Sequence, residues 1–597
     1  MLLAVSCGAA ATEWWVTPPS THVFLNSSAP PRRLSSTGAW SMALQRGEAE
    51  AFMVHARVAG VAGAAPLDLG PPALCDSSGS AHHGAPQAAG ASPPPPPLLF
   101  EWFKVAHVWC NRSSIYPAVS SRAGWYPDAL LDGAYFSGGR IALEPGATHS
   151  FFIRLRAPLA AAPGTRSVGV CFGGAAGHHP QGLTGRGRGA PAPLYRVNVT
   201  AQVWNLALPP LRSAFGTIFS FPYASDADGA TDLARYYGGG GGAGSPLDPA
   251  MKRRYFELLC DARIPPDNPY LLAARAAEDY GLLAACGAKR FNVLDVANAA
   301  TGKTLTNYSA AQIEAVLALA APTVANLTAQ GLLDRAYVYG FDECSEAYAG
   351  AMRQVFGAVK ARWPALRTVA ALRWTPPADL PLDVWVNLYS LWDEGAARAW
   401  RASRAGREAW AYHCISPRPS PPTGPMRWLN TFVELPPIEG RLLSWWAATR
   451  AVDGWLYYLV DGWSAGNGHR PLQLLPGSTA RTNFSAVRPN GVAVPGDRNA
   501  FSNGDGILLY PGVAGPLSSL RLEAYRDGLE DLELLRALAG RSPAGAAAAA
   551  ALAARVITGF APSVGVNATM DFSTLEAARR AAATQLTRDN TLSEELV

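Results

Sequence analysis

The sequence predicts a multidomain β plus α/β protein, with an N-terminal β-sandwich, a (β/α)8 TIM-type barrel and a C-terminal helical extension. Up to about residue 210, short apolar or alternating runs are separated by turn signals, which is typical of sandwich strands. Beyond that point, eight short apolar runs alternate with longer helix-like stretches, which is typical of a barrel. The length of 597 residues agrees, because a single hydrophobic core does not organise so long a chain.

Residues 21–210 form the predicted sandwich domain. Its clearest strand patterns lie at 50–59, 100–110, 149–158, 166–174 and 195–208. Two low-complexity inserts interrupt them, a proline-ended one at 60–98 and a Gly/His/Arg-rich one at 173–193, and both are expected to be surface loops. Residues 1–20 contain a short apolar stretch without a basic start, so they resemble at most a weak signal segment.

Residues 211–540 form the predicted barrel. Its strands are expected at 215–221, 268–272, 290–296, 336–342, 367–373, 383–389, 409–414 and 454–460. The second strand, 268–272, has the weakest pattern. A long loop, 461–505, precedes a helix at 521–540, whose leucines recur at helical spacing and whose charges predict a solvated face or a face docked on the barrel. Residues 541–597 are an alanine-rich helical extension.

Charge and hydropathy argue against two kinds of partner. The net charge is +5, but the 50 basic residues are spread along the chain without a block, so no nucleic-acid-binding surface is expected. No run of about 18 residues is apolar throughout, so no transmembrane segment is expected either.

Seven Asn-x-Ser/Thr sequons favour the secretory route, so we expect a secreted or lumenal protein, or a cytoplasmic one if the start is not a signal. The sequons lie at Asn26, Asn111, Asn198, Asn307, Asn326, Asn483 and Asn567. The eight cysteines show no Cys-x-x-Cys and no zinc spacing. Cys75 and Cys110 flank an insert and could pair in an oxidising compartment, or both could be free buried thiols.

The stretch YVYGFDECSEAY, residues 337–348, places two carboxylates side by side where the fourth barrel strand is expected to end. Catalytic residues of such barrels lie at the C-terminal ends of strands, so Asp342 and Glu343 are candidate catalytic residues. Like charges held close repel, which raises one pKa and helps to keep an acid protonated. The structural alternative is that Asp342 caps the next helix and Glu343 lies in its first turn.

Aromatic and polar side chains gather at the ends of the later strands and on the helix before the last one. They are Tyr389, Trp392, Tyr412, His413, Trp445, Trp446, Tyr457, Tyr458, Asp461 and Trp463. Any one of them alone would usually be a core residue. A carboxylate pair ringed by aromatic rings favours a carbohydrate site, because sugar C–H faces stack on rings while sugar hydroxyls need polar partners.

Adjacency of the two carboxylates favours one glycosidase mechanism over another. An acid and its nucleophile or base usually come from different strands, about 5 Å or more apart. Neighbours at one strand end suit substrate assistance instead, in which the 2-acetamido carbonyl of an N-acetylhexosamine attacks its own anomeric carbon. One carboxylate would then hold the acetamido N–H, and the other would protonate the leaving oxygen.

Four stretches of the chain resemble glycoside hydrolase family 123, the β-N-acetylgalactosaminidase family. They are GWYPDALL (124–131), YVYGFDE (337–343), the stretch from REAWAYHC to IEGRLLSWWAATRAVDGWLYYLVDGW (407–463) and the stretch from GDGILLYPG to SLRLEAYRDGLEDLELL (504–535). The resemblance covers most of residues 40–540, in order. It implies a retaining glycosidase, without metal or cofactor, that removes terminal β-linked N-acetylhexosamine, GalNAc preferred, from glycans or glycolipids.

The resemblance also implies roles for single residues. Asp342 falls on the family's acetamido-stabilising Asp, and Glu343 falls on its general acid/base. Arg441 matches a recurrent Arg that either binds substrate or pairs with a strand-end carboxylate. Tyr458 stands where the family commonly has Trp. With Arg441, the expected substrate-binding residues are Tyr389, Trp392, Tyr412, Trp445, Tyr457, Tyr458 and Trp463.

Two other functions stay open on the sequence. A glycan-binding protein without activity could use the same barrel mouth. A glycosidase for another sugar could use a classical nucleophile about 5 Å from Glu343, supplied by Asp393, Glu394 or Asp461. A metal site is not expected, because His413 and Cys414 lack partners at ligand spacing.

Overall fold

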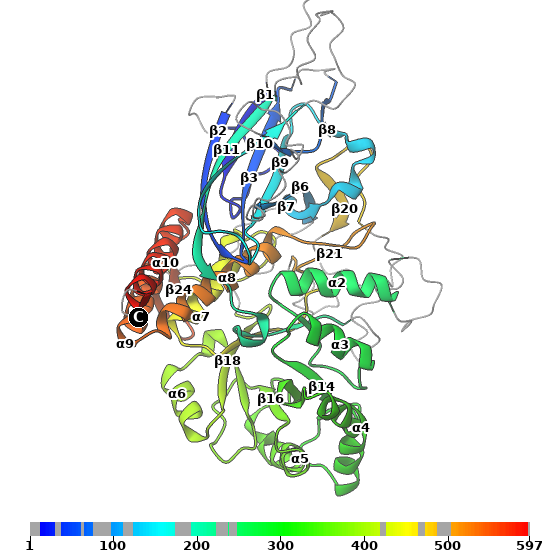
Figure 1. The fold of residues 1–597 in the computed structure, drawn as a ribbon. Coiled ribbons are helices and arrows are strands. Elements are labelled where there is room, and N and C mark those ends of the chain that lie inside the picture. The colour runs from blue at the N-terminus through cyan, green and yellow to red at the C-terminus, as the bar shows by residue number, and fades with distance from the viewer. Residues whose placement is uncertain are drawn as a thin grey trace, which may run out of the picture.

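The computed structural model describes residues 12–29, 37–60, 65–75, 97–110, 123–173, 193–222, 237, 247–417, 426–463, 472–485 and 503–594. A strand-rich N-terminal region is followed by a barrel and by a helical C-terminal part (Figure 1), so the chain has the predicted multidomain order. Most of the two predicted inserts, the glycine run 238–242 and residues 1–11 lie outside the described residues.

Two sheets make up most of the N-terminal region. The larger has the strand order β1-β3-β9-β6-β20, with β7 paired to β6, and the smaller has the order β2-β11-β10-β5. The larger sheet consists of β1 (Thr12–Thr17), β3 (Ala49–Val58), β6 (Leu99–Cys110), β7 (Gly124–Leu131), β9 (Thr148–Arg156) and β20 (Arg481–Ser485). The smaller consists of β2 (Thr37–Arg46), β5 (Ala73–Cys75), β10 (Gly164–Phe172) and β11 (Tyr195–Ala207), and a separate ladder joins β4 (Leu67–Leu69) to β8 (Ile141–Leu143). The packing of the two sheets as a sandwich stays a prediction.

Two strands of the larger sheet lie outside the boundaries expected from the sequence. β1 falls inside residues 1–20 and pairs with β3 along its whole length. β20 falls inside the predicted loop 461–505 and runs beside β6, with Arg481 opposite His107. The loop after the last barrel strand therefore reaches back into the N-terminal sheet and ties the two regions together.

The cysteine pairing differs from the pair expected at Cys75 and Cys110. Cys75 on β5 is bonded to Cys171 on the neighbouring strand β10, whereas Cys110 is a free and buried thiol. The sheet order explains the difference, because β5 is hydrogen-bonded to β10 while β6, which carries Cys110, belongs to the other sheet.

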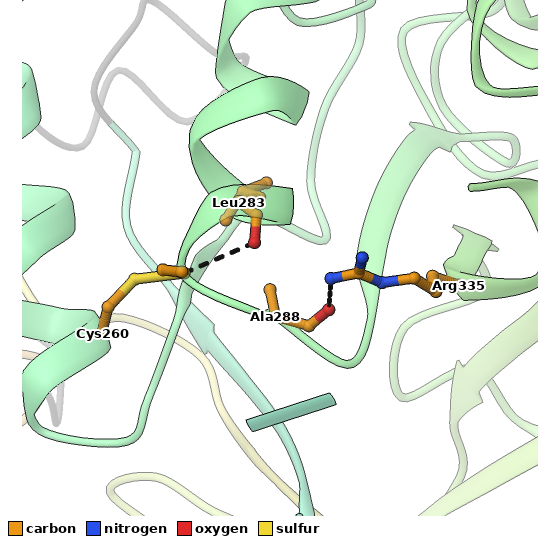
Figure 2. The surroundings of a disulfide bond; sticks show 5 residues. Cys260, Leu283, Ala288 and Arg335 are labelled. Atoms are coloured by element: carbon orange, nitrogen blue, oxygen red, sulfur yellow. Dashed lines mark hydrogen bonds between the residues drawn. A yellow bond between two sulfur atoms is a disulfide. The ribbon is translucent and has the colours of Figure 1, made fainter. Parts of the chain in front are cut away.

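A second disulfide bond lies among the helices of the barrel region. It joins Cys260 in α2 (Pro249–Asp261) to Cys286, the C-cap residue of α3 (Ala277–Ala285). Figure 2 shows Cys260 beside the end of α3, where the Cys286 sulfur lies 3.4 Å from the carbonyl oxygen of Leu283 and Arg335 donates to the carbonyl of Ala288.

Eight parallel strands form the barrel, in the order β13-β12-β19-β18-β17-β16-β15-β14. They are β12 (Gly216–Ser220), β13 (Pro266–Asp267), β14 (Phe291–Asp295), β15 (Ala336–Tyr339), β16 (Arg367–Ala371), β17 (Val384–Leu388), β18 (Glu408–His413) and β19 (Gly454–Tyr457). All but one overlap their predicted ranges. The exception is β13, which was expected at 268–272.

Prolines explain why the second barrel strand, β13, is short, and why the strand pairing of the barrel is interrupted beside it. We call this interruption the seam. The segment Ile264–Tyr270 contains three prolines, which lack the N–H that a regular ladder needs. The strand order ends at β13 on one side and β14 on the other, so the barrel is nearly closed. Across this seam, the Asn292 amide donates to the carbonyls of Asn268 and Pro269 at 2.9 and 3.0 Å, and Asp295 N–H donates to the carbonyl of Leu271 at 2.7 Å.

Helices lie around the barrel strands (Figure 1). Besides α2 and α3, they are α4 (Ala310–Ala329), α5 (Ala349–Arg362), α6 (Glu394–Ser403) and α7 (Ile438–Thr449). Among the described helices, α4 alone is long and apolar enough to cross a membrane by length and composition. Its Val316, Leu317 and Val324 are buried, as expected of a helix packed on the barrel, and one such helix is weak evidence for a membrane span.

The C-terminal part begins with α8 (Leu520–Ala539), which lies between the N-terminal strands and the barrel (Figure 1). It follows the small hairpin of β21 (Tyr510–Pro511) and β22 (Pro516–Leu517). Every residue of α8 from Leu520 to Leu535 is buried, so the expectation of a solvated face is wrong, and its charges are enclosed. The chain then forms α9 (Pro543–Val556), the hairpin of β23 (Ile557–Ala561) and β24 (Gly565–Ala568), and α10 (Phe572–Glu594).

Candidate active site

The adjacent carboxylates Asp342 and Glu343 follow β15 at the C-terminal end of the barrel. The backbone turns sharply there, since Phe341 and Glu343 have left-handed φ values of 59° and 49°. Such values are uncommon outside glycine, and residues that adopt them gather at functional sites. The turn is held by the next strand, because Glu343 N–H donates to the carbonyl of Ala371 at 2.8 Å. The two carboxylates are therefore fixed at the barrel mouth.

Helix capping does not account for the pair. The short 3-10 helix that follows has Ser345 as its N-cap, and α5 has Tyr348. Because a cap residue immediately precedes the first helical residue, the structural alternative for Asp342 and Glu343 is wrong.

A cavity of about 240 Å³ opens beside the pair. It is lined by Tyr270, Asp342, Glu343, Ala371, Arg373, Tyr412, Cys414, Ile415, Leu456, Tyr458 and Asp505. Pockets for drug-sized ligands measure about 300–1,000 Å³, so this space suits a smaller ligand, of the size of one ring with its substituents.

A side chain of β15, the strand that precedes Asp342, orients the Asp342 carboxylate. The Tyr339 hydroxyl donates to Asp342 Oδ1, and Tyr339 itself is fully buried inside the barrel. Burial raises the pKa of Tyr339 well above its usual value, and the charge of Asp342 adds to this effect. Tyr339 therefore stays a donor at every physiological pH and fixes the direction of the Asp342 carboxylate.

Glu343 is held by two side chains that also line the cavity. Arg373 Nη2 lies 2.6 Å from Glu343 Oε1, and the Tyr412 hydroxyl donates to the same oxygen. Arg373 Nε donates in turn to the Tyr412 hydroxyl at 3.1 Å, which closes a triangle of contacts. Burial and the Glu343 charge raise the pKa of Tyr412, so Tyr412 also remains a donor. Both contacts fall on Oε1, so Oε2 is the oxygen that a ligand can reach.

Only two of the eight predicted substrate-binding residues line the cavity, Tyr412 and Tyr458. Strand alternation explains the division. The side chains packed inside the barrel include Leu388, Tyr412 and Leu456, so even-numbered residues of β17, β18 and β19 face inward. Tyr389 and Tyr457 have the opposite parity and belong to the surrounding core.

The other aromatic predictions are corrected in the same way. Tyr389 donates to the carbonyl of Leu429 at 2.6 Å, and Trp463 Nε1 donates to the carbonyl of Leu509 at 2.8 Å. Trp392 packs edge-on against Trp446, and Trp445 Nε1 donates to Asp531 at 2.8 Å. These indoles and phenols are fully buried, and they stabilise the layer between the barrel and the helices rather than the ligand cavity.

Arg441 has the structural role that was its alternative. Its guanidinium lies 2.6 Å from Asp531 Oδ2 and 2.8 Å from Glu50 Oε1 on β3, and it is 2% exposed. The prediction that Arg441 binds substrate is therefore wrong, and its carboxylate partners lie on α8 and in the N-terminal sheet.

The carboxylates considered for a classical nucleophile lie outside the cavity lining. Asp393 caps α6 by accepting from Ala396 N–H at 2.8 Å, and the exposed Glu394 pairs with Arg450. Asp461 is fully buried, which raises its pKa well above the usual value. The carboxylates that do line the cavity, among the described residues, are Asp342, Glu343 and Asp505.

The best candidate for a cation site in the described chain is formed by Glu48, Glu50 and Asp531, whose oxygens lie within 4.8 Å of one another. Arginines take the place of an ion there, since Arg579 contacts all three carboxylates. His413 is a buried ring between Tyr525 and Trp455, and burial lowers its pKa to about 3. Neither group has the open coordination that a catalytic metal needs.

Four polar or thiol residues of the cavity were not among the expected site residues: Tyr270, Arg373, Cys414 and Asp505. Arg373 continues the inward parity of Val369 and Ala371 on β16, so strand alternation could have found it. Tyr270 and Asp505 come from irregular segments, where no periodicity marks a facing side.

A carboxylate pair with an arginine and tyrosines around a cavity, at the C-terminal ends of barrel strands, has the form of a glycoside hydrolase active site. Residues 284–538 match the family model described as the glycoside hydrolase 123 catalytic domain. The resemblance to glycoside hydrolase family 123 is thereby confirmed over these residues, and this match supports glycosidase activity. No curated protein matches the sequence.

A solved structure is similar in fold to this chain. A family 123 glycoside hydrolase from Clostridium perfringens, studied for glycolipid glycan hydrolysis, has a TM-score of 0.62 at 12% identity. The match covers 98% of this chain and 100% of that chain, so both share the order of strand-rich region and barrel. A β-D-glucuronidase from Dictyoglomus thermophilum has a TM-score of 0.22 at 9% identity, over 60% of this chain and 74% of that chain.

Proposed function

We propose that this protein is a retaining glycosidase that removes terminal β-linked N-acetylhexosamine, GalNAc preferred, from glycans or glycolipids by substrate-assisted catalysis. The observation that carries the proposal is the position of Asp342 and Glu343 as neighbours, both lining one small cavity. A cavity of about 240 Å³ suits a single terminal sugar. Adjacent carboxylates reach two atoms of one sugar more readily than the two faces of its anomeric carbon.

In the proposed first step, the acetamido carbonyl oxygen forms a bond to the anomeric carbon C1. The bond from C1 to the leaving oxygen breaks, and Glu343 gives its proton to that oxygen. Asp342 accepts a hydrogen bond from the acetamido N–H and stabilises the positive charge of the oxazolinium ring. Tyr339 orients Asp342 for this contact through its own hydrogen bond to Oδ1.

In the second step, water attacks C1 while Glu343 takes its proton, and the oxazolinium ring opens. Two displacements at C1 give net retention of the β configuration. Arg373 and Tyr412 hold Oε1 of Glu343 and so position the group for both proton transfers.

The test compares 4-nitrophenyl β-GalNAc, β-GlcNAc and β-galactoside side by side. We expect hydrolysis of the acetamido sugars alone, and inhibition by a thiazoline that mimics the oxazoline. Glu343→Gln should lose most activity on substrates with poor leaving groups and less on activated aryl glycosides, where acid assistance matters little. Asp342→Asn should lose activity on both. Full activity of both variants on a natural glycan would show that the assignment is wrong.

The second candidate function is glycan binding without turnover at the same mouth. Tyr270, Tyr412 and Tyr458 around the cavity favour it as much as they favour an enzyme. Binding on a glycan array, with no release of nitrophenol from any of the three substrates, would select this function.

We also propose that the protein acts in the secretory pathway or outside the cell. Two disulfide bonds support this, because such bonds persist in oxidising compartments. The sequon residues Asn26, Asn198 and Asn307 are exposed, as glycosylation requires. Treatment of the secreted protein with an N-glycan-releasing amidase should lower its mass, and an unchanged mass would argue against this location.

A further inference from the structure

We infer that Asp505 is a specificity-determining residue, which binds the 4- and 6-hydroxyl groups of the sugar in the cavity. This inference rests on the proposed function. Asp505 is 1% exposed, yet it lines the same cavity as the catalytic pair. It was not among the residues expected from the sequence, and it comes from an irregular segment, GDG at 504–506.

The barrel places Asp505 across the cavity from Asp342 and Glu343. The segment that carries it runs beside the end of β19, since Gly462 N–H donates to the carbonyl of Gly506, and Leu508 N–H to the carbonyl of Val460, both at 2.8 Å. In the strand order, β19 is separated from β15 by β18, β17 and β16. Four steps around an eight-stranded barrel lead to the opposite wall.

Two glycines give this segment a conformation that other residues would strain. Gly504 and Gly506 have φ values of 80° and 72°, and the space for a side chain is filled at both. A Cβ on Gly504 would lie 2.7 Å from Arg521 Nη1, and one on Gly506 would lie 2.7 Å from the Tyr458 hydroxyl. The chain therefore holds Asp505 between two points where only glycine fits.

Buried side chains anchor the same segment from behind. Arg521 donates to the carbonyl of Gly504 at 2.8 Å and is paired with Asp128 of β7 at the same distance. Gly506 N–H donates to the Tyr457 hydroxyl at 2.8 Å. Such support is expected where a carboxylate must be held in one place, because positioning groups work only when they are rigid.

The Asp505 carboxylate is also oriented within the cavity. Tyr458, which lines the cavity too, donates its hydroxyl to Asp505 Oδ2 at 2.9 Å, and the Tyr457 hydroxyl lies 3.4 Å from Oδ1. A carboxylate accepts hydrogen bonds from hydroxyl groups and repels anionic substituents. The wall near Asp505 thus fits a polyol edge and disfavours a carboxylated or sulfated one.

Ring geometry then identifies the hydroxyls. If C1 and the C2 acetamido group lie against Glu343 and Asp342, the atoms opposite them in the six-membered ring are C4 and C5. These atoms carry the 4-hydroxyl and the CH2OH group with the 6-hydroxyl. The 4-hydroxyl is the one whose orientation distinguishes GalNAc from GlcNAc, so Asp505 is placed to set that preference.

The test measures kcat/KM of the wild-type enzyme, Asp505→Asn and Asp393→Asn on aryl β-GalNAc, on aryl β-GlcNAc and on the 3-, 4- and 6-deoxy analogues of the preferred sugar. Asp393→Asn makes the same chemical change outside the cavity and is the matched control. In the wild type we expect kcat/KM to be roughly 10- to 100-fold lower for the 4- and 6-deoxy analogues than for the parent sugar, because these analogues lose a hydrogen bond to the charged Asp505 carboxylate. The 3-deoxy analogue should lose less. In Asp505→Asn the parent sugar should fall by a similar factor, the 4- and 6-deoxy analogues should fall little further, and the ratio of GalNAc to GlcNAc should move toward one.

The outcomes separate this inference from the proposed function. A wild-type enzyme that hydrolyses none of the acetamido sugars overturns the proposed function. A wild-type enzyme that hydrolyses them, with the same deoxy penalties in Asp505→Asn as in the wild type, overturns the role of Asp505 alone. If Asp505→Asn does not fold, Tyr458→Phe decides, since it removes the donor to Oδ2 and should show the same pattern of deoxy penalties with a smaller loss.

Discussion

Two regions of the molecule gather carboxylates, and they differ in what surrounds them. At the barrel mouth, Asp342 and Glu343 border a cavity, and Glu343 is paired with Arg373, whose side chain is 43% exposed. At the junction between the N-terminal strands and the barrel, around α8 (Figure 1), the carboxylates of Glu48, Glu50 and Asp531 are enclosed. In the sequence each region has two acidic residues close together, Asp342 and Glu343 at the mouth and Glu48 and Glu50 at the junction.

At the junction, arginines from separate elements neutralise the acids. Arg579 of α10 lies 2.9 Å from Glu50 Oε1 and 2.5 Å from Asp531 Oδ1, and it also contacts Glu48. Arg441 of α7 contacts Glu50 and Asp531 from another side. Burying charges costs several kcal/mol per ion, which only close opposite charges offset. The network therefore exists only when β3, α7, α8 and α10 are in place together.

The comparison teaches how to separate structural from functional acids in this fold. A carboxylate that is enclosed and contacts arginines of two elements holds the architecture. A carboxylate that is held by donors on one side and faces open space on the other can still bind a ligand. Asp342, Glu343 and Asp505 belong to the second kind, whereas Glu523, Asp527 and Asp531 of α8 belong to the first.

The largest effect that this comparison predicts is on stability. Arg579→Met leaves Glu48, Glu50 and Asp531 buried with one arginine fewer, so the free energy of unfolding should fall by about 3–5 kcal/mol, or the chain should fail to fold. Urea unfolding followed by tryptophan fluorescence measures this. The control is Arg353→Met, which breaks the exposed pair with Asp379 and should leave the unfolding curve unchanged. Equal unfolding midpoints for Arg579→Met and the wild type would mean that the network does not join the regions.

A smaller effect is expected at the mouth, and there it should fall on activity. Tyr339→Phe removes the hydroxyl that donates to Asp342, so kcat/KM on acetamido sugars should fall roughly tenfold, which corresponds to about 1.4 kcal/mol. The matched control is Tyr337→Phe, on the same strand and equally buried, whose hydroxyl donates to Asp267 at 2.7 Å outside the cavity lining. It should lower stability and leave the rate of the folded enzyme unchanged. If both variants lose the same activity, the position of Asp342 does not depend on Tyr339.

The fold could be predicted from the sequence where periodicity is strong. Seven barrel strands and the helix α8 lie where the apolar runs place them. The second strand was misplaced because the prolines around Pro266 remove ladder donors. β1 and β20 were missed because they are short and their partners are remote in sequence, so no local pattern marks them.

The candidate site could be predicted only in part. Asp342 and Glu343 were found because the end of a barrel strand is a known position for chemistry. The aromatic predictions treated both faces of each strand end alike, although alternation puts Tyr412 inside the barrel and Tyr389 outside it. Asp505 could not be found, since its place depends on a glycine-flanked segment whose path no periodicity reveals.

The last prediction tests whether a buried amine that forms no ion pair within the described residues behaves differently from the paired charges of α8. Lys104 of β6 is fully buried, and its ammonium donates to the carbonyl of Val105 at 3.2 Å. Burial lowers the pKa of Lys104 to about 7, although the charge of Glu144 opposes this shift. The unfolded chain keeps a lysine pKa near 10.5, so between about pH 7 and 10 the unfolded state binds more protons than the folded state.

The free energy of unfolding should therefore rise with pH between about pH 7 and 10, by up to about 1.4 kcal/mol per pH unit. Below pH 7 Lys104 is charged in the folded state as well, so the folded protein bears the full cost of burying that charge. Lys104→Met keeps the length of the side chain and removes the charge. We expect this variant to be more stable than the wild type at pH 6. Between pH 7 and 10, its free energy of unfolding should rise less with pH than that of the wild type. Urea unfolding at several pH values measures both. Parallel curves for the two proteins would mean that Lys104 finds an opposite charge in solution, as the arginines at the junction do.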